Sequence, residues 1–384
     1  LGALLLSVCS CGEKRRDQPV AVDGVLDLSD WDFEKDGIVG LRGEWRFVWE
    51  EFVKPMPIDA FRNEYKATIQ VPAIWPVEPH PDKPGEFLPG QGYATYALEI
   101  RLPVGIDRAA LAIFTRELSS AGTWMVSFAD GAKEMGRMAQ GVPGTSLDAT
   151  TPVWVNATAP LVTGGEVRVM LRLHLSNFRH ARGGTLYSPK LGLRKRVSQV
   201  ASFRLVLDAS IFGILFIIAL YHFILFLQHR EDRPSLFFAL FCGATALRQW
   251  MTGQFSQELG MGLSARGFEV LLALEYMTMP LMLMSSGLFV HALVPGPYFR
   301  RFVDGFCVGL GAVLVVFAFL TEPLIFSANV YLYQAHLFVA AAITLIYLVH
   351  EAVLGHVLAR WVCLAFAVIF VGTLNDILFS NHII

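Results

Sequence analysis

Charged and amide side chains interrupt long apolar stretches in the second half of this 384-residue sequence. The five positions are Asp208, Arg248, Glu275, Asn375 and Asp376. An ionised group inside a bilayer is costly, so it pairs with another group, lines a ligand or ion site, or lies where water reaches it. The sequence therefore predicts an intramembrane polar cluster in which Arg248 approaches Glu275, with Asp376 as the competing partner. Simple hydration at the membrane surface is the alternative for Asp208, Arg248 and Asp376.

A second set of candidate residues lies in the first half of the chain, in or beside loops. It combines aromatic rings with hydrogen-bonding groups, which is how proteins often bind small polar ligands such as sugars. These ligand-binding candidates are Trp75, Tyr93, Trp154, Asn177, His180 and Arg182. The alternative is structural: tryptophans in strand-like patterns often pack in a core, and Asn177 follows a predicted strand, where it would close a turn. Ligand binding and packing both remain open for this set.

Motifs for covalent or metal chemistry are missing from the sequence. His350-Glu351 is followed by His356, one position too far for the His-Glu-x-x-His spacing of a zinc protease. No cysteine lies between Cys11 and Cys242, so the first half has no thiolate metal site. We therefore expect no catalytic residue, no metal site and no cofactor. The formal net charge of −2 gives no indication of nucleic acid binding.

The intramembrane candidates need long helices to hold them. Apolar runs cover residues 205–227, 236–252, 268–294, 302–320, 328–348 and 361–379. Each contains about 17–25 mainly apolar residues, the length that a helix needs to cross the hydrocarbon core. Backbone polar groups in lipid must be satisfied within the segment, which favours helix. The sequence predicts an all-α transmembrane bundle at residues 205–384, with six spans visible.

The other candidates need a different scaffold, because the apolar pattern changes to alternation between residues 23 and 193. Residues 45–49, 96–102, 124–128 and 167–175 place an apolar side chain at every second position, as a strand with one buried face does. Asp130-Gly131 suits a hairpin turn, and residues 76–92 are rich in proline and glycine. Short strands separated by turn signals predict an all-β sandwich or jelly roll at residues 23–193.

Residues 1–22 have the features of a targeting segment. A short apolar run, residues 1–8, is followed by small residues and then by charged ones, as at the end of a secretory signal peptide. Residues 8–12 also resemble a bacterial lipobox, which makes Cys11 the lipidation candidate. A frayed apolar end is the alternative. Residues 194–204, with a basic cluster at 194–196, are interpreted as a linker that joins the sandwich to the bundle.

The charges on the connections between the apolar runs predict the orientation. The connections after the first, third and fifth runs carry Arg230 and Arg233, Arg300 and Arg301, and Arg360, whereas the other two carry one arginine or none. This asymmetry follows the positive-inside rule if the sandwich lies outside the cytoplasm. We expect a multi-pass protein of the bacterial inner membrane with an extracytoplasmic N-terminal domain. The basic cluster 194–196, which would lie on the outer side, is the exception.

An ordered series of short motifs across both halves carries a resemblance. The motifs are LRGEWRF at 41–47, VPAIW at 71–75, GYATY at 92–96, LSNFRHARGG at 175–184, LRQWMTG at 247–253 and NDIL at 375–378. The series resembles the bacterial seven-transmembrane receptors with diverse intracellular signalling modules. That resemblance implies an extracellular jelly roll similar to the galactose-binding-like sandwich of some glycosidases. It also implies a seventh span and a cytoplasmic output module, which we expect to lie beyond this sequence.

We therefore predict a membrane sensory receptor without catalysis in this polypeptide. Its sandwich would bind a small ligand, such as a carbohydrate, and its bundle would relay the signal to a cytoplasmic module in cis, with a homodimer as a further expectation. The alternative is a membrane transporter or channel with an extracytoplasmic accessory domain. A transporter would favour an internal repeat or paired broken helices, and neither pattern is visible in the sequence.

Overall fold

The computed structural model describes residues 16–105, 110–118, 120–131, 134–161, 167–253 and 264–380, without the side chains of residues 373, 376, 377, 379 and 380. The chain forms two compact units. Lys14–Leu207 and Gly253–Leu271 form the sandwich unit, and Asp208–Thr252 and Leu272–Ile384 belong to the helical unit. The lipidation candidate Cys11 lies outside the described residues.

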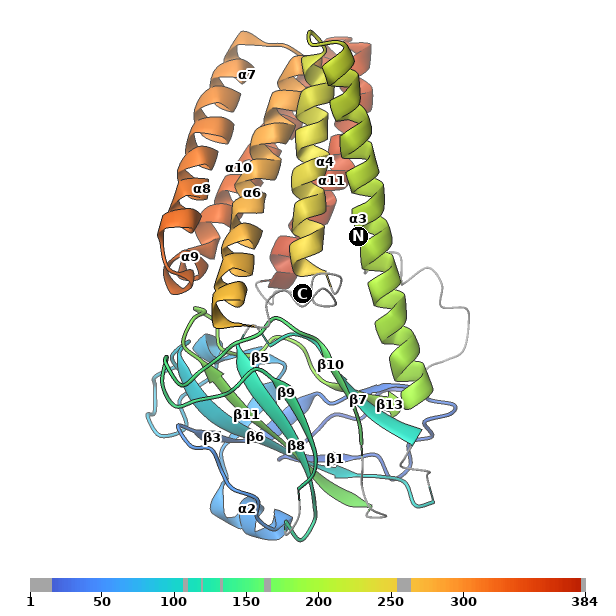
Figure 1. The fold of residues 1–384 in the computed structure, drawn as a ribbon, viewed down its shortest axis with the longest axis vertical. Helices are drawn as coiled ribbons and strands as arrows, with labels where there is room; N and C mark the ends of the chain where they lie inside the picture. Colours follow the sequence, from blue (N-terminus) through green and yellow to red (C-terminus); the bar gives the residue numbers. More distant parts are fainter. Residues whose placement is uncertain are drawn as a thin grey trace. The chain divides into compact units, whose positions relative to one another are not determined.

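The sandwich unit contains the predicted β-sandwich (Figure 1). Its large sheet has the strand order β4-β3-β6-β11-β8-β9, with β1 added in parallel to β6, and a second sheet has the order β10-β7-β13-β2. A short pair, β12-β5, completes the strands. The bounds are β1 (Val25–Asp27), β2 (Val39–Gly40), β3 (Gly43–Trp49), α2 (Ile58–Glu64), β4 (Thr68–Val71), β5 (Ala73–Ile74), η1 (Trp75–Val77), β6 (Gly92–Arg101), β7 (Leu111–Thr115), β8 (Ala121–Phe128), β9 (Glu134–Gln140), β10 (Ala157–Pro160), β11 (Arg168–Asn177), β12 (Gly184–Thr185) and β13 (Lys190–Leu193).

The main core lies between the two larger sheets. Leu171 and Leu173 of β11 point into it and are fully buried together with Trp45 of β3 and Ile113 of β7. Trp45 also makes an edge-on ring contact with Trp124 at 6.3 Å. Because alternate side chains of a strand point to opposite faces, this burial explains the alternation along β11. The structure confirms the predicted strands.

The opposite face of the large sheet is also buried, so the prediction of one buried face is wrong. Residues 50–66, which we call the strap and which include α2, cover it. Val53 and Phe61 of the strap pack in one apolar cluster with Met170 of β11. The Val53 amide also donates to Thr95 Oγ1 at 3.0 Å. Alternation within a strand cannot reveal a cover that comes from a distant segment. As a result, the polar residues of this face lie in a protein interior.

The six predicted apolar runs are helical except at Val294 and Asn329, and most of their residues belong to the helical unit. Among the described residues, four helical segments are long and apolar enough to cross a membrane: α3, α6, the stretch Pro297–Leu320 and α10. Val357–Gly372, within α11, is a shorter apolar helix. The bounds are α3 (Arg194–Gln228), α4 (Arg233–Thr252), α6 (Ala265–Leu293), α7 (Pro297–Phe302), η3 (Val303–Leu310, a π-helix), α8 (Gly311–Leu320), α9 (Pro323–Ala328), α10 (Val330–Val353) and α11 (Val357–Ser380).

Residues 194–204, which we predicted as a linker, form the first turns of α3. They contain neither glycine nor proline, so nothing in the sequence interrupts the helix. Val197 is buried in a small apolar cluster with Ala112 and Phe114 of β7. Arg196 donates from Nη2 to the backbone oxygen of Glu34 at 2.5 Å. The sandwich therefore continues into a helix without an extended connection.

Candidate functional site

Four of the six ligand-binding candidates lie in two loops that the fold brings together. Asn177 at the end of β11 donates from Nδ2 to the backbone oxygens of Gly90 and His180, both at 2.6 Å. The Trp75 amide donates to the Gly183 oxygen at 2.9 Å. The predicted candidates Trp75, Asn177, His180 and Arg182 therefore lie on loops 75–91 and 177–184, which are fastened to each other.

The side chains in these loops are largely occupied by internal contacts. Trp75 is fully buried, and its Nε1 donates to Tyr96 Oη at 2.6 Å. His180 Nδ1 accepts a hydrogen bond from the Arg182 amide at 3.1 Å. Burial lowers the pKa of His180 to about 4, so the imidazole is neutral at pH 7. Asn177 does close a turn, as the structural alternative predicted. Direct ligand contact by these residues stays a prediction.

The other two candidates make ring contacts with residues outside this pair of loops. Tyr93, at the start of β6, is half-buried and its ring lies 5.1 Å from that of Phe52 in the strap. Trp154 is buried, with its ring 5.9 Å from that of Phe268 in the first turns of α6. Tyr93 nevertheless lies opposite Ser176 of β11, one residue from Asn177, so it is close to the two loops.

An ion pair that the sequence did not suggest joins the 177–184 loop to α6. Arg179 Nη1 donates to Glu269 Oε1. Both residues belong to the sandwich unit, because that unit includes the first turns of α6 up to Leu271. Their separation in the sequence is 90 residues, and nothing in the spacing of Arg179 or Glu269 indicated that they would meet. The loop that carries His180 and Arg182 is thus fastened to a helix that continues into the helical unit.

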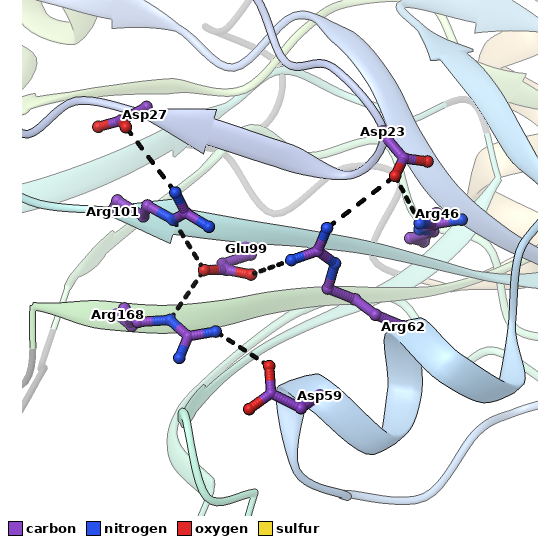
Figure 2. Close-up of polar contacts among 8 residues, drawn as sticks. All are labelled: Asp23, Asp27, Arg46, Asp59, Arg62, Glu99, Arg101 and Arg168. Carbon is purple, nitrogen blue, oxygen red and sulfur yellow. Dashed lines mark hydrogen bonds and ion pairs between the residues drawn. The ribbon is translucent and has the colours of Figure 1, made fainter.

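The face of the large sheet beneath α2 carries a network of four arginines and four carboxylates (Figure 2). At its centre is Glu99 of β6, which is 1% exposed. Its Oε1 accepts from Arg168 Nε at 2.9 Å and from Arg101 Nε at 3.0 Å, and its Oε2 lies 3.5 Å from Arg62 Nη1. The outer members of the network are Asp23, Asp27, Arg46 and Asp59.

The surroundings of Glu99 explain its charge state. Burial alone would raise the pKa of this carboxyl, but the hydrogen bonds from Arg168 and Arg101 hold it below its ordinary value. Each arginine around Glu99 also lies within 4.0 Å of an aspartate. For example, Asp59 Oδ1 is 3.2 Å from Arg168 Nη2. Because the cations and anions are matched, this network fastens α2 to the sheet and offers no spare charge to a ligand.

The structure confirms that Arg248 and Glu275 approach each other in the helical unit. Arg248 Nη2 lies 3.5 Å from Glu275 Oε1, and Arg248 Nη1 donates to the Glu275 backbone oxygen at 3.1 Å. Thr278, which is fully buried, accepts from the same Nη1 at 3.4 Å. Three acceptors around one guanidinium stabilise it in an apolar setting.

The remaining intramembrane candidates do not all join this pair. Asp208 of α3 accepts from Gln249 Nε2 of α4 at 3.1 Å. Asn375 is half-buried in α11. The side chain of Asp376, the competing partner for Arg248, lies outside the described residues. The described part of the cluster is therefore two adjacent polar pairs between helices rather than one shared site.

The helices contain an apolar groove, whereas no metal-binding group is found among the described residues. Across the part of the chain that the structure describes, no group of three or more His, Cys, Asp or Glu could hold a metal ion. An apolar groove of about 430 Å³ lies between α3 and α4, and Phe212, Phe216, Gly243 and Trp250 are among its lining residues. Its walls suit a hydrocarbon chain better than a polar ligand.

Comparison with known proteins gave one family match and several distant structural similarities. Residues 204–384 match the family model described as 7TM diverse intracellular signalling. Among solved structures, the chain is similar to a β-glucuronidase from Bacteroides uniformis at 14% identity, covering 40% of this chain and 17% of that one, with a TM-score of 0.28. A β-glucuronidase from Faecalibacterium prausnitzii is similar at 12% identity, covering 40% and 31%, with a TM-score of 0.28. The chain spans less than a third of either enzyme. No curated protein matches it significantly.

Proposed function

We propose that this chain, whose residues 204–384 match the model of the 7TM diverse intracellular signalling family, is a multi-pass membrane sensory receptor. The sandwich binds a small ligand, such as a carbohydrate, outside the cytoplasmic membrane of a bacterium. The bundle passes the bound state to a cytoplasmic signalling module in the same polypeptide. The arginine-rich connections support this orientation through the positive-inside rule.

The observation that carries this proposal is the Arg179–Glu269 ion pair. Arg179 lies in the 177–184 loop, which is fastened to loop 75–91. Glu269 lies on α6, and the same helix carries Glu275 beside Arg248. A ligand that shifts the loops would therefore act on one end of a continuous helix. A helix is stiff over this distance, so the displacement reaches the polar pair without a flexible joint.

The chemistry of the two loops favours a polar ligand. Arg182 is half-buried, and the peptide groups of residues 177–184 lie beside it. The side chains of Trp75 and Asn177 are held by internal hydrogen bonds, so they would position the loop rather than contact the ligand. The transporter alternative has no observation in its favour among the described residues.

The test uses the purified chain in lipid nanodiscs and a panel of neutral and acidic sugars. Ligand binding is detected by tryptophan fluorescence, and hydrogen exchange is followed in peptides that cover α6. For a sugar that binds, we expect exchange in α6 to change in the wild type. In Arg179→Ala the sugar should still bind, but exchange in α6 should no longer respond.

Lys35→Ala is the matched control, because Lys35 is an exposed cation of the sandwich unit that pairs with Asp32. This variant should behave as the wild type does. If no sugar in the panel binds, the carbohydrate class is wrong. If α6 responds equally in Arg179→Ala, the proposed route is wrong. Sugar uptake into proteoliposomes would favour the transporter instead.

A further inference from the structure

The strap-covered face of the large sheet has two halves that differ in charge. On one half, Glu99 is surrounded by Arg62, Arg101 and Arg168, and the wider network is balanced. The other half consists of the outward side chains of β11, β8 and β9. There the central charged residue is Arg172 of β11, opposite Met125 of β8. This half has no equivalent of the matched network.

Arg172 is a buried cation without a counter-ion among the described residues. It is 1% exposed, and its Nε and Nη1 have no hydrogen-bond partner. Its Nη2 reaches only Ser127 Oγ, at a long 3.5 Å. Glu134, the acidic residue on this side, accepts from Arg137 Nε at 3.0 Å instead. Burial lowers the pKa of Arg172 despite the influence of Glu134.

The other basic groups on this half are paired or neutral. Arg137 of β9 extends across the face, and its Nη2 lies 3.9 Å from Met125 Sδ. His174 is stacked on Phe52 of the strap at 4.8 Å and contacts the Val53 oxygen at 3.1 Å. Burial lowers the pKa of His174 to about 4, so its ring is neutral at pH 7. The excess positive charge therefore comes from Arg172, because Arg137 is paired with Glu134.

A buried arginine in this position needs a counter-ion to stabilise its charge. The guanidinium does not lose its proton in proteins, so burial cannot be relieved by neutralisation. Leaving a buried charge without its partner is strongly destabilising. A leucine or methionine would fill the same space without a buried charge. On the other half of the same face, by contrast, the buried charge of Glu99 is matched by arginines.

We propose that Arg172 belongs to a binding site for a small oxyanion, a carboxylate or phosphate group, between the large sheet and the strap. The planar fork of Arg172 would hold two of its oxygens, because guanidinium geometry matches such groups. Ser127 would donate its hydroxyl. The anion would enter under the strap, which Val53 and Thr95 fasten by a hydrogen bond at 3.0 Å.

This site is separate from the 177–184 loop and does not depend on the proposed function. An oxyanion at Arg172 could stabilise the sandwich whether or not the receptor senses a sugar. The experiment therefore measures anion binding itself and uses no signalling readout.

The test measures binding of radiolabelled inorganic phosphate to the full chain in detergent, at constant ionic strength. We expect saturable binding at one site, competition by acetate and no competition by chloride at the same concentration. Arg172→Met should weaken phosphate binding at least tenfold. Arg101→Met is the matched control, since Arg101 is already paired with Glu99, and its affinity should equal that of the wild type.

Thermal unfolding gives a second readout. Phosphate stabilises many proteins without binding to a site, so the comparison between variants decides the result. Phosphate should raise the melting temperature of Arg172→Met less than that of the wild type. If Arg172→Met does not fold, Arg172→Lys, which keeps the charge but loses the fork, should bind phosphate more weakly. Absence of saturable binding, equal affinity in the Arg172 variants, or equal competition by chloride would overturn the proposal.

Discussion

Replacing Glu99 by glutamine tests whether the charge network under α2 stabilises the sandwich. Arg168 and Arg101 each donate a hydrogen bond to the carboxylate, at 2.9 and 3.0 Å, and a bond to a charged group contributes about 1.5–3 kcal/mol. The side chains of Arg62, Arg168 and Arg101 are 32%, 36% and 42% exposed, so water replaces part of what each one loses. We therefore expect Glu99→Gln to lower the free energy of unfolding by about 2–3 kcal/mol.

The assay is thermal unfolding of the full chain in detergent, followed by tryptophan fluorescence. Of the 8 tryptophans, six precede residue 194, so the signal reports mainly on the sandwich. A loss of this size corresponds to a fall in melting temperature of about 4–12 °C for a domain of this length. Glu134→Gln is the control, because Glu134 belongs to an exposed pair that contributes about 0–1 kcal/mol.

The direction in which the pKa of Glu99 is shifted determines how its contribution to stability changes with pH. Burial raises the pKa of Glu99, but the arginine hydrogen bonds outweigh it, so the folded-state pKa lies below the unfolded one. Stability from such a group is present above the unfolded pKa and is lost as the pH falls through the folded pKa. The difference between wild type and Glu99→Gln should therefore be constant from pH 7 to pH 5 and shrink below pH 4. A constant difference down to pH 3, or equal melting temperatures at pH 7, would refute the reasoning.

Other predictions concern the loop and the helices. Burial holds the pKa of His180 at about 4, against 6.5 when exposed, so its contribution to stability is full above pH 6.5 and falls as the pH drops toward 4. Between pH 7 and pH 5, His180→Asn should therefore lose about 2 kcal/mol less free energy of unfolding than the wild type, as measured by urea unfolding. Equal losses in the two proteins would contradict this. Arg248→Ala and Glu275→Ala should each lower the free energy of unfolding by about 1–2 kcal/mol and reduce the folded protein recovered from membranes. The double variant should be no less stable than the less stable single variant, whereas additive losses would exclude the pair. Gly183→Ala would place a Cβ 2.2 Å from the Trp75 ring, so it should lower the free energy of unfolding by about 1–3 kcal/mol with a shift in tryptophan emission; a variant as stable as the wild type would show that this contact relaxes freely.

Local pattern was sufficient to predict many of the elements. The alternation at residues 167–175 predicted β11, because one face of that strand packs in the sandwich core. The pairing of Arg248 and Glu275 was also predictable, since both residues lie near the short connection between consecutive apolar runs. In each case the information lies within one segment or between neighbours in the chain.

Contacts between distant segments were not predictable in this way. The strap buries the polar face of β11, yet neither the strap nor the strand shows the pattern of a partner for the other. Arg179 and Glu269 are ordinary charged residues until the fold places them together. Asn177 was recognised as a candidate and as a turn residue, and only its hydrogen bonds to Gly90 and His180 show the second role.

The pairing of β2 with β13 has a consequence for the order of synthesis and folding. Val39 lies opposite Leu191, and the Leu41 amide donates to the Pro189 oxygen at 2.8 Å. The second sheet therefore cannot be completed until nearly the whole sandwich has been synthesised, and such distant pairings fold slowly. Arg194, the first residue of α3, follows β13 directly. The last strand is therefore synthesised immediately before the first apolar helix, so the sandwich can close only when synthesis has reached the membrane-spanning half.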